Sequence, residues 1–376
     1  MIKLSGDTSP CSNWSRTYSL LNEGSKASAF AQTTDGGFII GTSFKDWVIK
    51  TDSNGNIQWQ KKYGTPHGEE GINAIKQTSD GGYVIASNTA YLYASNYVIK
   101  LDLYGNIQWQ KMYIFSAIGE RISYDIEELK EGGYIMLVSG SFNKIIWLVR
   151  LDADGNPVWI KQFNEVNFDD IYNAYDIYPV SDGGFVIAGT AFLKGRSTSY
   201  EIWVAKMDAS GNIVWQRTYA YDDSMIGRNI IETNNKGFLV SGRAIGNRLV
   251  LIKIDAFGNF QWQKMTEGYE FEPFDILMQA TKDGVAIISS QIINGNEKDG
   301  FIMKVSADGE IEWSKLYDYQ YYDRFYMIIQ TNAGGYAVAG YTKELDKYAK
   351  VWVMKLDSTG DIDPSCPVVE NITLTL

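Results

Sequence analysis

The strongest constraint on the fold of this chain is an internal repeat that returns about every 50 residues. One copy reads 47-WVIKTDSNGNIQWQKKY-63, and further copies begin at residues 97, 147, 203, 250, 301 and 352. The second Trp of the copy occurs seven times, at residues 14, 59, 109, 159, 215, 262 and 313. The copy at 352 stops before its Trp, whereas Trp14 stands alone near the start. The two ends therefore supply complementary halves of one unit, and seven units are predicted.

A second signature, a DGG turn followed by a short apolar run, precedes the copies, as in 35-DGGFIIG-41. Short β-prone runs alternate with Gly-containing turns, and no stretch sustains the apolar period of a helix. One unit reads as four antiparallel strands over 72–78, 82–87, 97–102 and 106–113. Four strands per unit at this period are typical of a β-propeller. We predict an all-β, seven-bladed β-propeller in a single domain over 1–376, with the repeats at about 14–363.

The two ends of the chain are expected to meet. The N-terminal strand around Trp14 completes the last blade in this prediction and closes the ring, which removes two exposed strand edges. Cys11 and Cys366 lie on short tails just outside the repeats, so a disulfide between them would lock the closure. Two free buried thiols are the alternative.

A disulfide implies an oxidising compartment, so the expected location is extracellular or on the cell surface. The start, MIKLSGDTSPCSN, lacks the apolar core of a signal peptide, so a leader is either removed or absent. A cytoplasmic location is the alternative. With 34 Lys+Arg against 45 Asp+Glu the formal charge is -11, which excludes nucleic acid as the expected partner. The longest apolar runs, such as 145-IIWLV-149, are too short to enter a membrane as a spanning helix.

The recurring Trp and Asp residues have a structural interpretation. All eleven Trp fall on repeat positions, which favours packing between blades over an aromatic platform for ligands. The Asp that opens the DxxGN turn is expected to cap backbone N–H groups. The segment 152-DADGN-156 also looks like the start of a calcium loop, but Phe163 stands where such a loop needs Glu. No cofactor is expected, with Ca²⁺ as the alternative.

The LDxxGNIxW element resembles the tryptophan-docking motif of quinoprotein-type propellers, and more loosely the Asp-box of sialidase-type propellers. Taken whole, the repeats resemble secreted or surface propellers of archaea and bacteria, mostly of undefined function. Quinone-cofactor dehydrogenases of that group usually carry a vicinal cysteine pair. This chain lacks one, so the resemblance implies the architecture and not the cofactor.

Essentially all of the excess negative charge falls on one set of loops, those joining the outer strand of each unit to the inner strand of the next. These seven loops hold fourteen acids and two bases, Lys26 and Arg324, and they lie together at one mouth of a propeller. Acids beside aromatics suit a glycan, a cationic peptide or a divalent cation. The candidate ligand-binding residues are Asp169, Asp170, Tyr221, Asp222, Asp223, Tyr269, Glu270, Tyr321, Tyr322, Asp323, Arg121, Arg228 and Arg324.

The sequence favours a non-catalytic module that binds a glycan, peptide or protein partner at this acidic, aromatic mouth. His67 is the only histidine, and neither a GxSxG nor an HExxH motif occurs. One alternative is a carbohydrate-active enzyme, sialidase-like or another glycosidase, that uses the acids and Arg121, Arg228 and Arg324. Another is a structural subunit of a surface assembly.

Overall fold

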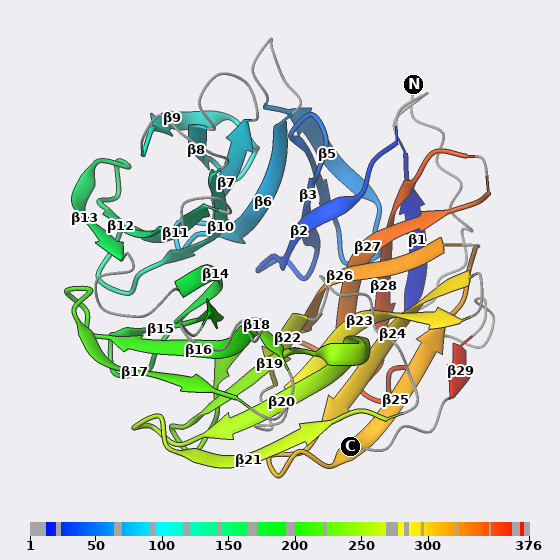
Figure 1. Cartoon of the computed structure of the whole chain (residues 1–376). Coiled ribbons are helices and arrows are strands. Elements are labelled where there is room, and N and C mark those ends of the chain that lie inside the picture. Colours follow the sequence, from blue (N-terminus) through cyan, green and yellow to red (C-terminus); the bar gives the residue numbers. More distant parts are fainter. Residues whose placement is uncertain are drawn as a thin grey trace. The chain divides into compact units, whose positions relative to one another are not determined.

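The computed structural model describes residues 13–19, 24–63, 70–89, 95–115, 121–140, 145–163, 171–192, 200–220, 224–267, 277–281, 286–294, 297–320, 322–345, 347–362 and 369–371. These residues form strands β1 to β29 and one short 3₁₀ turn, η2 (Ile245–Asn247). Within them, no helix is long and apolar enough to cross a membrane. The chain is an all-β protein of the β-propeller class, with four antiparallel strands per blade (Figure 1).

Five sheets have four strands each, in chain order. The first holds β2 (Ala27–Gln32), β3 (Phe38–Thr42), β4 (Trp47–Thr51) and β5 (Ile57–Lys62). The second holds β6 (Glu70–Gln77), β7 (Tyr83–Thr89), β8 (Ser95–Leu101) and β9 (Ile107–Tyr113). The third holds β10 (Arg121–Glu128), β11 (Tyr134–Gly140), β12 (Ile146–Leu151) and β13 (Pro157–Phe163). The fourth holds β14 (Ile171–Pro179), β15 (Phe185–Phe192), β16 (Tyr200–Met207) and β17 (Ile213–Tyr219). The fifth holds β18 (Met225–Glu232), β19 (Phe238–Ala244), β20 (Arg248–Ile254) and β21 (Phe260–Met265).

The sixth sheet has nine strands, and it corrects the predicted blade count. Its members are β22 (Leu277–Ala280), β23 (Ala286–Asn294), β24 (Glu297–Val305), β25 (Ile311–Tyr317), β26 (Tyr322–Gln330), β27 (Tyr336–Lys343), β28 (Lys350–Leu356), β1 (Trp14–Tyr18) and β29 (Val369–Asn371). The structure has six blades, so the prediction of seven is wrong. The reason is a parallel bridge between Lys298 of β24 and Tyr322 of β26, which joins the last two repeats into one sheet.

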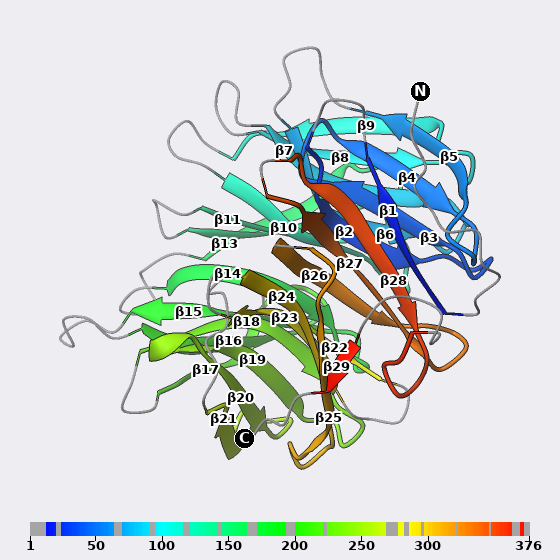
Figure 2. The same ribbon diagram turned by 90° about the vertical axis from the view of Figure 1, so that its right-hand side faces the viewer.

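The expected partnership between the two ends of the repeat array is present in this sheet. Strand β1 pairs antiparallel with β28 from Trp14 opposite Lys355 to Tyr18 opposite Val351, and the two strands lie side by side in Figures 1 and 2. At another edge, β29 pairs with β25. The N-terminal segment therefore supplies the strand that the last repeat lacks.

The chain packs as two compact units. The first, called unit 1, comprises Met1–Pro66, Glu70–Gln77 and Thr266–Leu376, and the second, unit 2, comprises His67–Glu69 and Thr78–Met265. Each has its own apolar clusters. In unit 1 one cluster gathers Trp14, Phe38 and Trp47, and in unit 2 another gathers Phe185, Ile187 and Trp203. The prediction that residues 1–376 form one domain stays a prediction.

Burial along a blade follows from its place in the stack of strands. Every residue of β4 is buried, and Trp47 and Ile49 pack in one apolar cluster with Val351 and Val353 of the sixth sheet. The outer strand β5 instead alternates between half-buried and exposed residues. Trp47 is only 1% exposed, and its indole nitrogen donates to Gln60 at 3.2 Å. The apolar runs of the repeat therefore form the core, and its polar residues face water on the outer strand.

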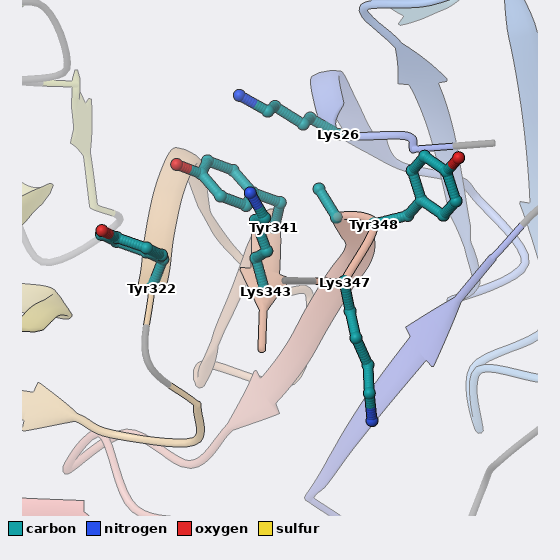
Figure 3. A pocket seen from close by; sticks show the side chains of 7 residues that line it. Lys26, Tyr322, Tyr341, Lys343, Lys347 and Tyr348 are labelled. Carbon is teal, nitrogen blue, oxygen red and sulfur yellow. The ribbon is translucent and has the colours of Figure 1, made fainter. Parts of the chain in front are cut away.

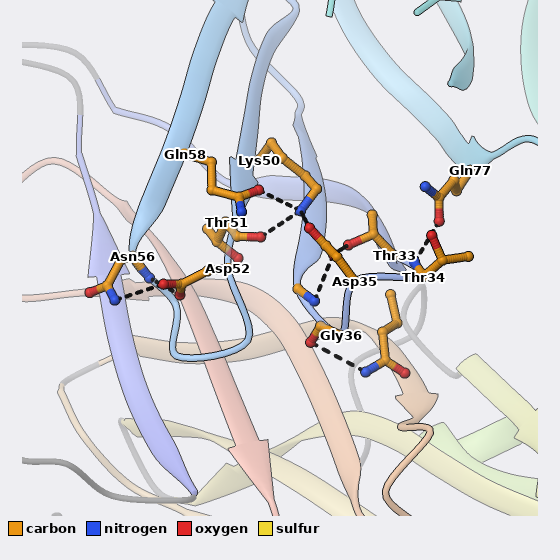
Figure 4. A network of polar contacts seen from close by, with 12 residues as sticks. Thr33, Thr34, Asp35, Gly36, Lys50, Thr51, Asp52, Asn56, Gln58 and Gln77 are labelled. Carbon is orange, nitrogen blue, oxygen red and sulfur yellow. Dashed lines mark hydrogen bonds and ion pairs between the residues drawn. The ribbon is translucent and has the colours of Figure 1, made fainter. Parts of the chain in front are cut away.

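In several blades a buried lysine of the third strand binds the Asp of the DGG turn, as Figure 4 shows for Lys50 and Asp35. Nζ of Lys50 donates to Asp35 at 2.8 Å, to the carbonyl of Thr51 at 2.7 Å and to Gln58 at 2.8 Å. Burial raises the pKa of Asp35, but hydrogen bonds from Lys50, Thr33 and Gly37 outweigh it and hold the pKa at about 2. The same pairing recurs in Lys100–Asp80 and Lys206–Asp182.

Candidate functional site

Most of the predicted ligand-binding residues fall outside the described part of the chain. These are Asp169, Asp170, Tyr221, Asp222, Asp223, Tyr269, Glu270 and Tyr321. Cys11 and Cys366 are also outside it, so the disulfide stays a prediction. Arg121 begins β10, but its side chain is outside the described residues. Of the other four, Tyr322, Asp323 and Arg324 lie together on β26 in unit 1, and Arg228 lies on β18 in unit 2.

The outer-strand Trp residues are used for packing between successive blades. Nε1 of Trp109 donates to the carbonyl of Ala153 at 3.2 Å, and its ring lies against Gly155 in the same turn. Nearby, the hydroxyl of Tyr113 donates to the carbonyl of Gly155 at 2.6 Å. The equivalent ring-to-glycine contacts are Trp14 on Gly55, Trp159 on Gly211, Trp215 on Gly258 and Trp313 on Gly360. At these positions the predicted packing role is confirmed.

The turn Asp residues cap their own backbone, as the sequence predicts. Asp152 accepts from the backbone N–H of Asn156 at 2.7 Å, from its side-chain amide at 2.9 Å and from the N–H of Asp154 at 3.0 Å. These hydrogen bonds, led by those from Asn156, hold the pKa of Asp152 below its ordinary value. Asp52, Asp102 and Asp255 make the same contacts. Among the described residues, no group of three or more His, Cys, Asp or Glu could hold a metal ion.

A cluster of cations and tyrosines gathers in unit 1, where β26 and β27 meet the segment before β2. The guanidinium of Arg324 lies 4.9 Å from the ring of Tyr326, whose ring centroid is 5.8 Å from that of Tyr341. On Tyr341, in turn, Nζ of Lys26 lies 4.4 Å from the ring centroid. Two neighbouring aromatic rings therefore hold two cations near one another. We call Lys26, Arg324, Tyr326, Tyr341 and Lys343 the basic cluster.

Backbone pairing explains why these residues meet. Arg324 stands opposite Tyr341 in the β26–β27 ladder, and Tyr322 stands opposite Lys343. The N–H of Ser25 donates to the carbonyl of Ala349 at 3.0 Å, which brings Lys26 beside the loop after β27. Main-chain hydrogen bonds thus hold β26, β27 and the chain just before β28 beside the segment around Lys26, which is distant from them in the sequence.

A pocket of about 380 Å³ opens beside the basic cluster. It is lined by Lys26, Tyr322, Tyr341, Lys343, Lys347, Tyr348 and Ala349 (Figure 3). Figure 3 shows that the side chain of Lys347 runs away from the ammonium groups of Lys26 and Lys343. Lys347 is instead paired with Glu344. The pocket is therefore basic and aromatic, in contrast to the acidic character expected for the mouth as a whole.

The electrostatics of the pocket favour an anion. Burial lowers the pKa of Lys26, and the positive charges of Arg324 and Lys343 lower it further. Holding these like charges together raises the free energy of the protein, and binding of an anion would lower it. Tyrosine hydroxyls and rings around the charges provide hydrogen bonds and apolar surface for the rest of a ligand.

Asp323 does not take part in the pocket, although it lies between two residues that do. Its side chain is fully buried, and Oδ2 accepts from the backbone N–H groups of Tyr319 at 2.5 Å and Gln320 at 2.8 Å. Burial raises its pKa to about 6, against the effect of these hydrogen bonds. The ring of Tyr319 stacks on Trp352 at 5.7 Å. Asp323 thus fixes the turn that precedes Tyr322, and it is a positioning residue rather than a ligand contact.

No protein-family model matches the chain, and neither does any curated protein. Solved structures do. Virginiamycin B lyase from Staphylococcus aureus is similar with a TM-score of 0.59 at 15% identity, over 92% of this chain and 99% of that one. Puromycin hydrolase is similar with a TM-score of 0.59 at 12% identity, over 95% of this chain and 56% of that one. Raptor from Chaetomium thermophilum has a TM-score of 0.56 at 10% identity, over 91% and 29%. These likenesses show the fold alone.

Sequence reasoning missed Tyr341, Tyr326, Tyr348 and Lys343 as site residues. The two bases that it counted in the acidic loops, Lys26 and Arg324, are the ones that converge here. The signal that could have found the cluster is the pairing of 322–330 with 336–343, which sets Tyr322 opposite Lys343 and Arg324 opposite Tyr341.

Proposed function

We propose that this chain is a non-catalytic binding module and that the pocket of unit 1 takes the anionic group of its ligand. The observation that carries the proposal is the convergence of Lys26 and Lys343 on one pocket, with Lys26 held over Tyr341 at 4.4 Å. No described carboxylate forms an ion pair with either ammonium group. A carboxylate, sulfate or phosphate group would supply a counter-charge to both ammonium groups.

The ligand class follows from the lining. Charge-assisted hydrogen bonds from the lysines would hold the anionic group, and the tyrosines would contact the body of the ligand. A glycan or a protein segment bearing acidic groups meets both requirements. We also propose that binding takes place outside the cell or on its surface. The acidic loops would add contacts to a ligand that also carries positive charge.

The proposal is tested by titrating the purified chain with sodium sulfate and with sodium glucuronate in a buffer of low ionic strength. Lys26→Gln and Lys343→Gln are each expected to weaken binding by roughly 10-fold or more, the loss typical of one charge-assisted hydrogen bond. Lys347→Gln is the matched control, because it removes the same charge from the same pocket wall but from a side chain that is paired with Glu344. It should leave affinity within about twofold, and added salt should weaken all binding.

Two outcomes would overturn the proposal. One is equal affinity of the wild type and the Lys26→Gln/Lys343→Gln double variant for both anions. The other is binding of a cationic oligolysine peptide with no binding of either anion, which would place recognition in the acidic loops. Turnover of a glycan panel by the wild type would replace the non-catalytic part with the carbohydrate-active alternative.

A further inference from the structure

A β-bulge recurs on the innermost strand of the repeat. In each of five inner strands the register with the second strand shifts by one residue, so that one residue is left out of the ladder. Among these residues are Ser28, Tyr124, Tyr175, Arg228 and Tyr326, and β14 has a second shift, at residue 172. A bulge turns the extra side chain away from the regular alternation of the strand, and bulges are common beside binding sites. Tyr326 already belongs to the basic cluster of unit 1.

Unit 2 has its own pair of such residues in contact. The guanidinium of Arg228, from the bulge of β18, lies 4.1 Å from the ring centroid of Tyr175, from the bulge of β14. Asp176 fixes the two strands relative to each other. Its Oδ2 accepts from the side-chain amide of Asn229 at 2.7 Å and from the N–H of Ile230 at 2.8 Å. These hydrogen bonds, made by the residues that follow each bulge, hold β14 and β18 together where Arg228 meets Tyr175.

A second arginine stands next to this stack. Arg243 lies on β19 opposite Ile226, two residues before Arg228. Its Nη1 donates to the side-chain oxygen of Asn247 at 2.7 Å. Asn247 has a left-handed backbone, with φ at 55°, and it follows Gly246 at 74° in the η2 turn. Strained backbone of this kind persists where the surrounding structure requires it and is frequent at binding sites.

Arg228 and Arg243 lie on paired strands, within two positions of one another along the ladder. Burial lowers the pKa of Arg243, and the charge of Arg228 lowers it further. Both side chains and Tyr175 are partly exposed, so solvent reaches them. Two guanidinium groups, each fixed by a partner other than a ligand, present preformed donors to an oxyanion, whose geometry matches that of a guanidinium.

We propose that Arg228, Arg243 and Tyr175 form a second oxyanion-binding site, located in unit 2 and independent of the pocket of unit 1. The ligand group is a carboxylate, or a sulfate or phosphate ester. Tyr175 holds Arg228 in place, and Asn247 holds Arg243.

The test uses the whole chain carrying Lys26→Gln and Lys343→Gln, so that the site of unit 1 does not contribute. In this background, sulfate and acetate are titrated separately, to distinguish a tetrahedral from a planar anion, while the arginine Nε–Hε signals are followed by NMR. Addition of one of them should shift the Arg228 and Arg243 signals along a saturating curve. Arg228→Gln should reduce affinity at least 10-fold. Arg228→Lys should also weaken binding several-fold, because it keeps the charge and loses the planar fork.

Arg217→Gln is the matched control, since Arg217 is an exposed arginine on β17 of the same unit. It should leave affinity unchanged. Thermal unfolding of each variant separates a loss of binding from a loss of fold. If Arg228→Gln is destabilised, the loss of affinity is judged from Arg228→Lys instead. The proposal is overturned if neither anion shifts the two arginine signals, or if Arg228→Gln binds as well as Arg217→Gln. A failure here leaves the unit 1 proposal standing, because that site is tested with Arg228 and Arg243 intact.

Discussion

The indole ring of Trp109 lies directly against Gly155, so closely that a β-carbon on this glycine would stand 2.7 Å from two ring carbons. Gly155 also has a left-handed backbone, with φ at 76°. A glycine is therefore required twice at this position, once for its conformation and once for the space that the Trp ring occupies. The same relationship recurs at other blades and explains why the sequence keeps Gly and Trp at fixed spacing.

Replacing Gly155 by Ala should destabilise the fold strongly. A side chain at positive φ costs about 1–2 kcal/mol, and the clash with Trp109 adds about 1–3 kcal/mol. Gly81→Ala is the control, because Gly81 has a similar φ of 82° but no atom within 4 Å of the added carbon. Urea unfolding should show Gly155→Ala about 2 kcal/mol less stable than Gly81→Ala. Equal losses would mean that the Trp contact adds nothing.

Tyr113→Phe should cost about 1 kcal/mol of stability, because it leaves the carbonyl of Gly155 without the hydroxyl that now donates at 2.6 Å. Tyr104→Phe removes the same hydroxyl from a side chain that is 66% exposed, in the same blade, and should change the free energy of unfolding by less than about 0.5 kcal/mol. If the two variants unfold at the same urea concentration, the inter-blade hydrogen bond does not stabilise the fold.

Asn235→Asp should stabilise the protein at neutral pH. Lys253 is buried with Thr233 and Asn235 as its partners, where Lys50 has Asp35. Burial lowers the pKa of Lys253 to about 8. The unfolded chain therefore binds one more proton than the folded chain between about pH 8 and 10.5, and stability should rise with pH in that window.

A carboxylate at 235 would raise the pKa of Lys253 and remove that rise. The expected gain at pH 7 is about 1–2 kcal/mol, measured by urea unfolding at pH 7 and pH 9.5. Asn234→Asp, at the neighbouring turn residue, is the control and should keep the wild-type pH profile. An unchanged profile in Asn235→Asp would show that the lysine does not titrate in this range.

Asp323→Asn should flatten the stability of the protein between about pH 4 and pH 6. The folded pKa of Asp323, about 6, lies above its ordinary 3.8, so the folded state binds more protons in this window and stability falls as the pH rises through it. Besides the two backbone donors, the charged group near this carboxylate is Asp318, whose negative charge also raises the pKa of Asp323. Asn keeps an oxygen for the N–H groups of Tyr319 and Gln320 and carries no charge.

We therefore expect Asp323→Asn to equal the wild type near pH 4 and to exceed its stability at pH 7 by roughly 1–3 kcal/mol. Asp308→Asn, at an exposed turn, should follow the wild type throughout. A variant with the wild-type slope would assign the titration to another group.

The repeat predicted the strands well, because the DGG and DxxGN turns restrict the backbone locally. Asp52 and Gly55 act within five residues, so their role can be deduced from the sequence. The blade count could not be deduced, because it depends on a single long-range bridge from Lys298 to Tyr322. The site could not be deduced either. Counting charged residues on the loops gives only their net charge. The contact between Lys26 and Tyr341 depends instead on strand register and on the hydrogen bond from Ser25 to Ala349.

The central claim is that the cations of unit 1 form an anion site, and anomalous diffraction from crystals soaked in sodium bromide tests it most directly. We expect a bromide peak in the pocket, within contact of the ammonium groups of Lys26 and Lys343, that disappears in Lys26→Gln crystals and persists in Lys347→Gln crystals. Bromide at other surface positions with none in this pocket, or a pocket peak that survives Lys26→Gln, would contradict it.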